Sequence, residues 1–552
     1  MFNNMWHHYC QRFKVLLLTT GAVALPLFFS PFTPYDPFLI PKEVLLSSLA
    51  CLALVFVFLP LETLLHKSNS AIFLAILFFL GCISISLPQG INYHIGLMEL
   101  KRWVYLLILF FTASQINWNV NRLRKFMVIS VIAGGIVGVS VILEYLEIIT
   151  FFSSPLRADH PTLGYRLFSF FGYQNITAQY LIIILMWCIG LTLMKSNVME
   201  RTGAWICTMI IGTALLLTFC RGAIVSAALG IAILFFIKKN KINIETNYYR
   251  KKRFLLFACC IIIVSTSIYI FINKPTSLAT NHFADKIIKQ LYYIIERGDN
   301  ERFIRWKDTF NMIRFNPVNG VGLGNYSNIY PLFKTGNWTN ITIYAHNEYL
   351  HMLAETGLIG LLGFGGFLIF AFIRSIKKIT GAQREDEKIL LITILLGCIV
   401  TMIHSNFSYN FHSAASSYFF FIGLGVLCSR ESSVKDESLF SKSYLIANII
   451  VFVFAVGISI WGLSSEYHKF KSHYHLSQAL ISIKNDNHDL AIRHLLSAID
   501  LQPYNPQNYA LLSQQYGQTG QKSLADFYFG KAQELSPYLY EYKLSIGVPT
   551  MK

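Results

Sequence analysis

Long apolar stretches, each bounded by short polar or charged segments, recur from the start of the chain to about residue 463. Many approach the roughly 20 residues that a helix needs to cross a bilayer. We count thirteen of them, near 14–31, 43–63, 70–87, 103–117, 125–149, 177–194, 203–219, 222–238, 254–273, 352–374, 388–405, 414–429 and 443–463. The pattern predicts an all-α polytopic membrane protein with about 12–13 transmembrane helices.

Two longer polar segments interrupt or follow this pattern. If the N-terminus is cytoplasmic, thirteen spans place residues 274–351 outside as a large extracytoplasmic loop. The short turns around Arg221 and 404–412 fall on that same side. We therefore expect a membrane domain over 1–465 and a soluble, extracytoplasmic domain over 466–552.

The C-terminal segment contains an internal repeat. AIRHLLSAIDLQP (491–503) aligns with ADFYFGKAQELSP (525–537) at a spacing of 34 residues. A 34-residue period with small residues, an apolar stripe and a closing proline is typical of tetratricopeptide repeats, whose helix pairs stack into a concave surface. The repeat predicts a small α-helical, tetratricopeptide-like domain that binds a protein partner.

Composition supports a membrane protein and argues against a nucleic-acid-binding, disulfide-rich or zinc-binding protein. The 552 residues are 54% hydrophobic and only 14% charged, with a net charge of +17. The basic residues gather in the segments 119–125, 238–253 and 375–388, which are predicted to be cytoplasmic, as the positive-inside rule expects. The charge therefore indicates topology and contact with membrane lipids, not nucleic-acid binding. The ten cysteines lie in or beside apolar stretches without a C-x-x-C pair, which argues against disulfides and zinc.

Several arginines lie between or beside apolar segments, where a charged side chain is unexpected. Arg221 sits between two apolar stretches, in a turn predicted to be outside, where the positive-inside rule disfavours it. The segment 301–317 predicts an amphipathic helix that carries Arg302 and Arg305 beside an apolar face. Because guanidinium groups match phosphate oxygens, we expect these arginines to bind a phosphate group. The alternatives are a snorkelling arginine and an ordinary surface helix.

The end of the predicted loop carries the candidate catalytic group. His346 is followed by Asn347 and Glu348 just before a membrane helix, and a histidine there can take a proton from a sugar hydroxyl. The alternative is a histidine that only forms hydrogen bonds at a helix start. We expect His346 to be catalytic and Asn347 and Glu348 to contact substrate. Arg166 and Asn175, at the outer end of another span, are expected to line the same cavity.

The sequence leaves open the roles of other polar residues on the predicted outer side. His404 and His412 flank an outer turn and are alternative contacts to the acceptor, and Glu355 is either a helix hydrogen bonder or an orienter of His346. NGVGLGNY (319–326) lacks the spacing of a nucleotide-binding loop, so it predicts a tight turn with a close backbone approach.

Together these residues resemble the O-antigen ligase family. The resemblance rests on Arg166 with GYQN, on CRGA, on R-x-x-x-W followed by NPxxGVGLGNY, and on AHNEYLHMLAETGLIGLL, over roughly residues 10–430. It implies a GT-C-like glycosyltransferase that uses a glycan on undecaprenyl pyrophosphate and needs no metal or other cofactor. By position, His346 matches the proposed general base, and Arg221 and Arg302 match arginines that contact the donor pyrophosphate.

The resemblance leaves the acceptor open. Lipid A-core as acceptor gives a ligase, which we rank first; a second lipid-linked repeat unit gives a polymerase; and a protein Ser or Thr gives an O-oligosaccharyltransferase. Each would act at the outer face of the bacterial inner membrane. A transporter or flippase ranks last, because the sequence shows neither inverted repeats nor charges near the bilayer midplane.

Overall fold

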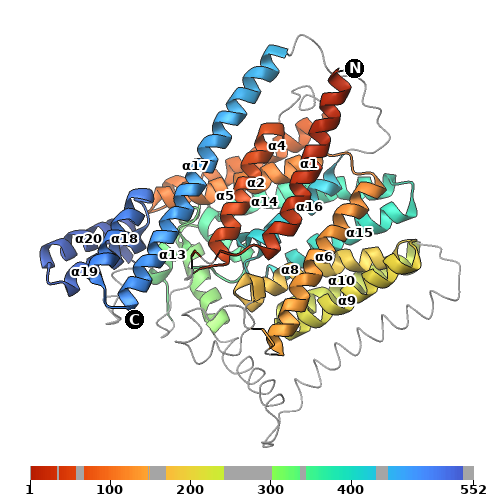
Figure 1. Cartoon of the computed structure of the whole chain (residues 1–552). Helices are drawn as coiled ribbons and strands as arrows, with labels where there is room; N and C mark the ends of the chain where they lie inside the picture. The colour runs from red at the N-terminus through yellow and green to blue at the C-terminus, as the bar shows by residue number, and fades with distance from the viewer. Residues whose placement is uncertain are drawn as a thin grey trace, which may run out of the picture.

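The computed structural model describes residues 2–57 apart from 31, 34 and 35, residues 67–149 apart from 147, and residues 169–241, 301–335, 343–429 and 445–538. Within these ranges every regular element is a helix, and the main ones are labelled in Figure 1. They are α1 (Phe2–Leu27), α2 (Leu39–Val57), α4 (Lys67–Ser84), α5 (Tyr93–Ser114), α6 (Val120–Tyr145), α8 (Gln174–Leu193), α9 (Val198–Leu217), α10 (Arg221–Lys241), α13 (Tyr326–Ile329), α14 (Glu348–Gly381), α15 (Glu385–His404), α16 (Ala414–Cys428), α17 (Leu445–Lys484), α18 (His488–Leu501), α19 (Pro506–Gln518) and α20 (Lys522–Leu535). Short 3-10 turns occur at η1 (Leu87–Gln89), η2 (Ser169–Phe171), η3 (Tyr330–Leu332) and η4 (Asn410–His412), and residues 301–315 are also helical.

The prediction of an all-α polytopic membrane protein is confirmed. Seven helices in the described part of the chain are long and apolar enough to cross a membrane. They include α2, α6, α8, α14, α15 and α17, together with the helix that begins in α4. Twelve of the thirteen predicted stretches coincide with a described helix, and the stretch 254–273 lies outside the described residues. The total of 12–13 spans and the GT-C-like arrangement remain predictions.

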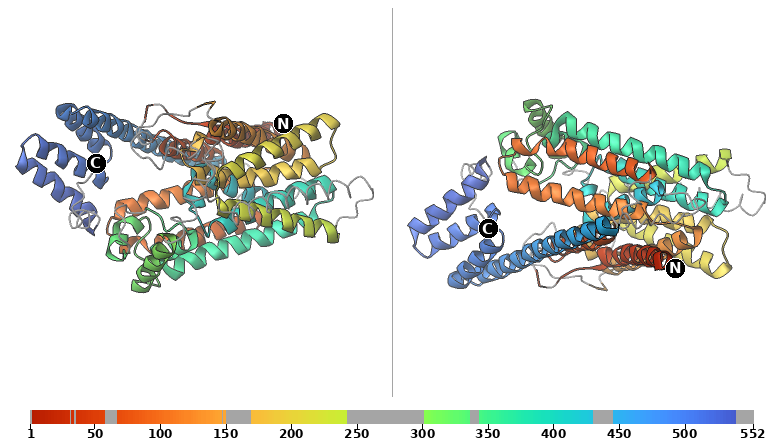
Figure 2. Two further views of the ribbon diagram at one scale, coloured as in Figure 1. Left: turned by 90° about the horizontal axis from the view of Figure 1, so that it is seen from below. Right: turned by 90° about the horizontal axis from the view of Figure 1, so that it is seen from above.

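The centre of the bundle is built from helices that are apolar on every side. All residues of α16 are buried, as are nearly all of α8. A helix of that kind must be enclosed by others. Accordingly, α8 packs against α6, α9, α10 and α15, while α16 packs against α5, α14 and α2. Figure 2 shows the same bundle from two further directions.

Asparagine marks the start of several helices. The side chains of Asn92, Asn119, Asn197 and Asn487 each accept a hydrogen bond from a backbone N–H in the first turn of the helix that follows. An N-cap of this kind satisfies a donor that the helix itself leaves free. The chain therefore encodes where these helices begin, independently of their apolar content.

A break in α14 explains the glycine-rich segment before it. Gly357 has φ 63°, outside the helical region, and a Cβ there would lie 2.1 Å from the Val318 carbonyl oxygen. The carbonyls of Ala354 and Glu355 accept hydrogen bonds from the N–H groups of Val321 and Gly322, each at 2.9 Å. The predicted tight turn with a close backbone approach is thus present, and the surface it approaches is the kink of α14.

Helix α17 joins the bundle to the C-terminal helices. It packs against α2 and then against α18, and α18, α19 and α20 pack in succession at one end of the molecule (Figure 1). Ser536 after α20 donates a hydrogen bond of 2.7 Å to Asn328, which fixes this end to the segment before α14.

The predicted boundary at 465/466 lies inside α17. The division into two domains and the tetratricopeptide character of the second remain predictions. The predicted loop 274–351 is described only over 301–335 and 343–351.

Candidate functional site

The helix over 301–315 is held firmly against the loop that follows it. Asp308 is buried and accepts hydrogen bonds from the Tyr330 hydroxyl at 2.9 Å and the Thr335 hydroxyl at 2.7 Å. Trp306 donates from Nε1 to the carbonyl oxygen of Ala345 at 3.1 Å. These bonds bring the arginine-bearing turn of the helix next to residue 346.

His346 has an unusual backbone and an unsatisfied ring nitrogen. Its φ of 55° lies in the left-handed region, which residues other than glycine seldom adopt and which often marks functional sites. Its Nδ1 is buried without a hydrogen-bond partner among the residues described. The edge of its ring faces Tyr409, with the ring centres 5.2 Å apart. An imidazole nitrogen in this state is able to accept a proton from an incoming group.

Arg302 and Arg305 surround this imidazole with positive charge. Burial, and then the charges of Arg305 and Arg302, lower the pKa of His346 to about 3. The ring is therefore neutral at physiological pH, as a general base must be. The Nε of Arg305 is also buried and makes no hydrogen bond within the described part of the chain. Both arginines are thus close to the proposed base, and Arg305 retains a donor.

Arg221 belongs to the same cluster through Cys220. It begins α10, its side chain is exposed, and it acts electrostatically on the Cys220 thiol together with Arg302. The Cys220 sulfur lies 3.5 Å from Nε2 of His404. Arg302 also interacts electrostatically with His404 and Tyr409. Four predicted site residues, which are spread over 125 positions from Arg221 to His346, are therefore connected. Arg302 and Arg305 act on His346, and Arg302 and Arg221 act on Cys220.

The other predicted site residues have different surroundings. Arg166 lies outside the described residues. Asn175 is the second residue of α8, and Tyr173 just before that helix interacts electrostatically with Tyr409 at the cluster. Asn347 is the N-cap of α14 and accepts hydrogen bonds from the N–H groups of Tyr349 and Leu350. The direct substrate contacts predicted for Asn175 and Asn347 remain predictions.

Glu348 is buried in an internal polar network. It accepts hydrogen bonds from the Phe411 N–H at 2.5 Å and from Nδ1 of His412 at 3.1 Å. Nε2 of His412 lies 3.4 Å from Glu99, which also pairs with Arg102. The geometry gives Glu348 a role in holding the turn before α16, and its predicted contact with substrate remains a prediction.

The two other histidines on this side are both buried and hydrogen-bonded to neighbouring side chains. Nδ1 of His404 lies 2.9 Å from Asn410 Oδ1, and the residue is buried. Burial alone would lower the pKa of His412, but the charge of Glu348 and the bonds to Glu348 and Glu99 raise it to about 9. His412 therefore carries a proton at neutral pH and has no capacity to take another.

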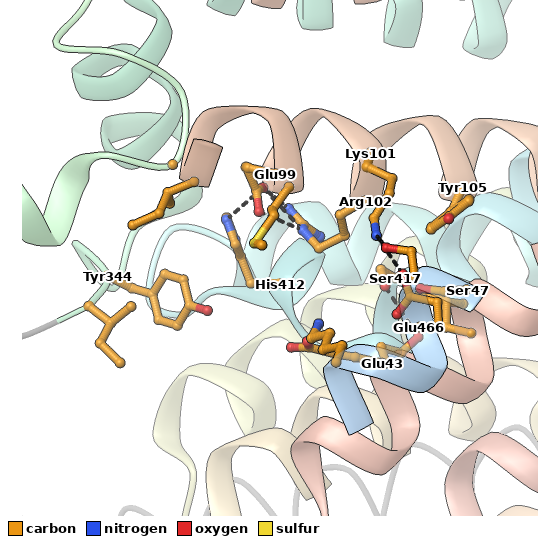
Figure 3. Close-up of a pocket in the computed structure, with 18 of the residues that line it drawn as sticks. Glu43, Ser47, Glu99, Lys101, Arg102, Tyr105, Tyr344, His412, Ser417 and Glu466 are labelled. Carbon is orange, nitrogen blue, oxygen red and sulfur yellow. Dashed lines mark hydrogen bonds and ion pairs between the residues drawn. The ribbon is translucent and has the colours of Figure 1, made fainter. Parts of the chain in front are cut away.

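Sequence reasoning missed the Glu99–Arg102 pair. Arg102 Nε lies 3.1 and 3.0 Å from the two carboxylate oxygens of Glu99, and the same guanidinium donates to the Phe411 carbonyl. Figure 3 shows both residues pointing toward His412. The signal was present as the run MELKRW just before the apolar stretch at 103–117, since ionisable residues in membrane helices commonly pair with one another.

Glu355, which the sequence left undecided, orders the glycine-rich segment. Its two carboxylate oxygens accept hydrogen bonds from the N–H groups of Gly324 at 2.9 Å and Tyr326 at 3.0 Å. Its Oε1 also lies 3.5 Å from Nε2 of His351. Glu355 thus stabilises the turn beside the site, and its predicted role as an orienter of His346 remains a prediction.

The comparison with known proteins concerns the segment that carries most of these residues. Residues 206–365 match a family described as O-Antigen ligase. No curated protein matches the chain. The matched segment contains Arg221, Arg302, Arg305 and His346, and the family supports glycosyl transfer of the O-antigen ligase or polymerase type at a membrane. Over residues 206–365, in a chain with helices able to span a membrane, the sequence is thus similar to the O-antigen ligase family.

Proposed function

We propose that this protein transfers a glycan from undecaprenyl pyrophosphate to an acceptor hydroxyl at the outer face of the bacterial inner membrane. The acceptor that we favour is lipid A-core, which makes the protein an O-antigen ligase. The single observation that carries the proposal is the neutral His346 imidazole with an unpartnered Nδ1 beside Arg302 and Arg305.

The chemistry of transfer assigns each group a task. His346 would take the proton from the acceptor hydroxyl, whose oxygen then attacks the anomeric carbon of the donor sugar. The bond from that carbon to the pyrophosphate oxygen breaks, and undecaprenyl pyrophosphate leaves with the bonding electrons. Arg221, Arg302 and Arg305 would stabilise the negative charge that develops on the leaving oxygen. In this scheme the fixed guanidinium groups would meet that charge without a metal ion.

The electrostatics also suggest how the base would become active. In the free protein the nearby arginines and burial make His346 a weak base. A bound pyrophosphate would neutralise part of the arginine charge, which favours protonation of the imidazole. The base would then strengthen only when the donor is in place.

The experiment uses the full chain reconstituted in liposomes with an undecaprenyl-pyrophosphate-linked glycan and EDTA. Three acceptors are offered separately: lipid A-core, a second lipid-linked repeat unit, and an exported protein rich in Ser and Thr. Wild type is compared with His346→Ala and with a matched control, His468→Ala, which removes an exposed histidine from α17.

Transfer to lipid A-core that is lost in His346→Ala and kept in His468→Ala supports the ligase. Transfer to one of the other two acceptors reassigns the protein as a polymerase or an oligosaccharyltransferase. Full activity of His346→Ala rejects His346 as the base. Transfer that EDTA abolishes and added divalent metal restores rejects the metal-independent scheme.

A further inference from the structure

A cavity of about 290 Å³ with several charged and hydroxyl-bearing side chains in its wall lies beside the arginine and histidine cluster. Its walls come from α2, α5, α13, α14, α16 and α17, from the segments before α13, α14 and α16, and from Gln502 after α18. Figure 3 shows several of the lining side chains. None of the arginines assigned above to the donor pyrophosphate lines it. The volume is at the lower end of what small-ligand sites have, which suits one or two sugar residues.

Most of the charges in its wall lie beside a charge of opposite sign, and His412 lies 3.4 Å from Glu99. Lys101 lies 2.8 Å from Glu466, and Lys469 lies 2.7 Å from Glu43. Arg102 pairs with Glu99 in the same wall. A cavity whose charges already neutralise one another offers many hydrogen-bonding groups but does not attract a strongly charged ligand. That favours a polyhydroxyl ligand over a phosphate or a cation.

One wall atom has an unmet hydrogen-bonding requirement. Glu466 is only 2% exposed, and its Oε2 has no hydrogen-bond partner anywhere in the described ranges. Leaving a buried carboxylate oxygen unsatisfied is costly, so such atoms are expected to bind something. A sugar hydroxyl would donate to it, and the side chains of Ser47, Ser417 and Ser465 surround the same space.

Two aromatic rings in contact connect the wall of the cavity to His346, the proposed base. Tyr344 lines the cavity and stacks on Tyr409 with ring centres 4.6 Å apart. Tyr409 in turn contacts the ring of His346 at 5.2 Å. The Tyr344–Tyr409 ring pair therefore lies between the cavity and the proposed base.

We infer that this cavity binds sugar residues of the acceptor glycan through their hydroxyl groups, with Glu466 as a hydrogen-bond acceptor and the C-terminal helices closing one side. The assignment to the acceptor rests on the proposed function. The binding of a neutral sugar chain rests on the cavity alone.

The test measures binding without any donor, on the full chain in lipid nanodiscs. Two fluorescently labelled probes are titrated: core oligosaccharide released from lipopolysaccharide by mild acid, and the lipid-free repeat-unit oligosaccharide. The key variant is Lys101→Met/Glu466→Leu, which removes the pair without leaving a buried unpaired charge. Its matched control is Lys531→Met/Glu534→Leu, an exposed pair at 2.9 Å on α20. Ser327→Trp fills the cavity and leaves every wall charge in place.

We expect saturable binding of at least one probe to wild type and to the control. Affinity should fall about tenfold or more in the key variant and in Ser327→Trp. Binding of inorganic pyrophosphate should stay unchanged in both variants. The probe that binds identifies the source of the sugar.

The inference is overturned if neither probe binds wild type, or if Ser327→Trp binds as wild type does. Ser327→Trp decides the question even if the double variant is unstable. These results are independent of transfer, so a failure of the proposed function would appear in the liposome assay and not here.

Discussion

Trp306 donates a hydrogen bond of 3.1 Å to the carbonyl of Ala345, and this bond links the helix that carries Arg302 and Arg305 to the residue before His346. A left-handed backbone at a histidine is costly in conformation, and the two cations beside this one make its protonation costly as well. The indole therefore has a positioning role, because it fixes the relative placement of the groups proposed for catalysis.

Trp306→Phe keeps the ring and removes only this hydrogen bond. We expect glycosyl transfer to fall several-fold in kcat, while stability changes by only about 1 kcal/mol, the usual contribution of one such bond. The measurement combines steady-state transfer with thermal unfolding in detergent. Trp461→Phe, at an indole that is 68% exposed on α17, is the control and should behave as wild type. Equal rates in both variants would remove the positioning role.

The pH dependence of transfer tests the arginine–histidine arrangement. Because the pKa of His346 is held near 3, kcat/KM of wild type should not fall through loss of this base between pH 8 and 5. The double variant Arg302→Gln/Arg305→Gln removes two positive charges beside His346. This change favours the imidazolium form and raises the pKa of His346. The fall of kcat/KM on the acid side of the pH profile should therefore occur at higher pH in the variant than in wild type. An unchanged acid limb would mean that these arginines do not control His346.

The network around His412 predicts a loss of stability in alkaline solution. Its folded pKa of about 9 lies above the ordinary value of 6.5, so the bonds to Glu348 and Glu99 stabilise the fold fully below about pH 6.5. That contribution, up to about 3 kcal/mol, is lost as pH rises through 9. Thermal unfolding of wild type should weaken over this range. His412→Gln should unfold at a lower temperature at pH 6 and show a flatter pH dependence.

The kink of α14 is expected to tolerate only glycine at position 357. Gly357→Ala places a Cβ 2.1 Å from the Val318 oxygen at a φ of 63°, and we expect a loss of roughly 1–3 kcal/mol in unfolding free energy, with lower transfer. The control is Gly365→Ala in the same helix, where nothing lies within 4 Å of the new Cβ. That change should be neutral or slightly stabilising. Thermal unfolding of both variants decides the comparison.

Several features of the fold were predictable because they depend on local sequence. The apolar stretches predicted the helices, since a span needs only length and hydropathy, and the stretch 414–429 coincides closely with α16. The glycine-rich turn was predictable because glycine alone tolerates the backbone that it adopts at Gly320 and Gly322. The boundary expected at residue 465 shows the limit of this approach, since α17 continues from apolar into polar sequence without a break.

The sequence by itself determined that this is a helical membrane protein with a segment similar to the O-antigen ligase family, and it singled out Arg221, Arg302, Arg305 and His346. These inferences rest on hydropathy, on spacing and on the cost of charges in apolar surroundings. The tertiary structure alone decided that His346 is neutral while His412 is protonated, and that Glu99, Arg102 and Glu466 surround a cavity. The physical reason is that the pKa of a group and the shape of a cavity depend on neighbours hundreds of residues away in sequence, such as Lys101 and Glu466.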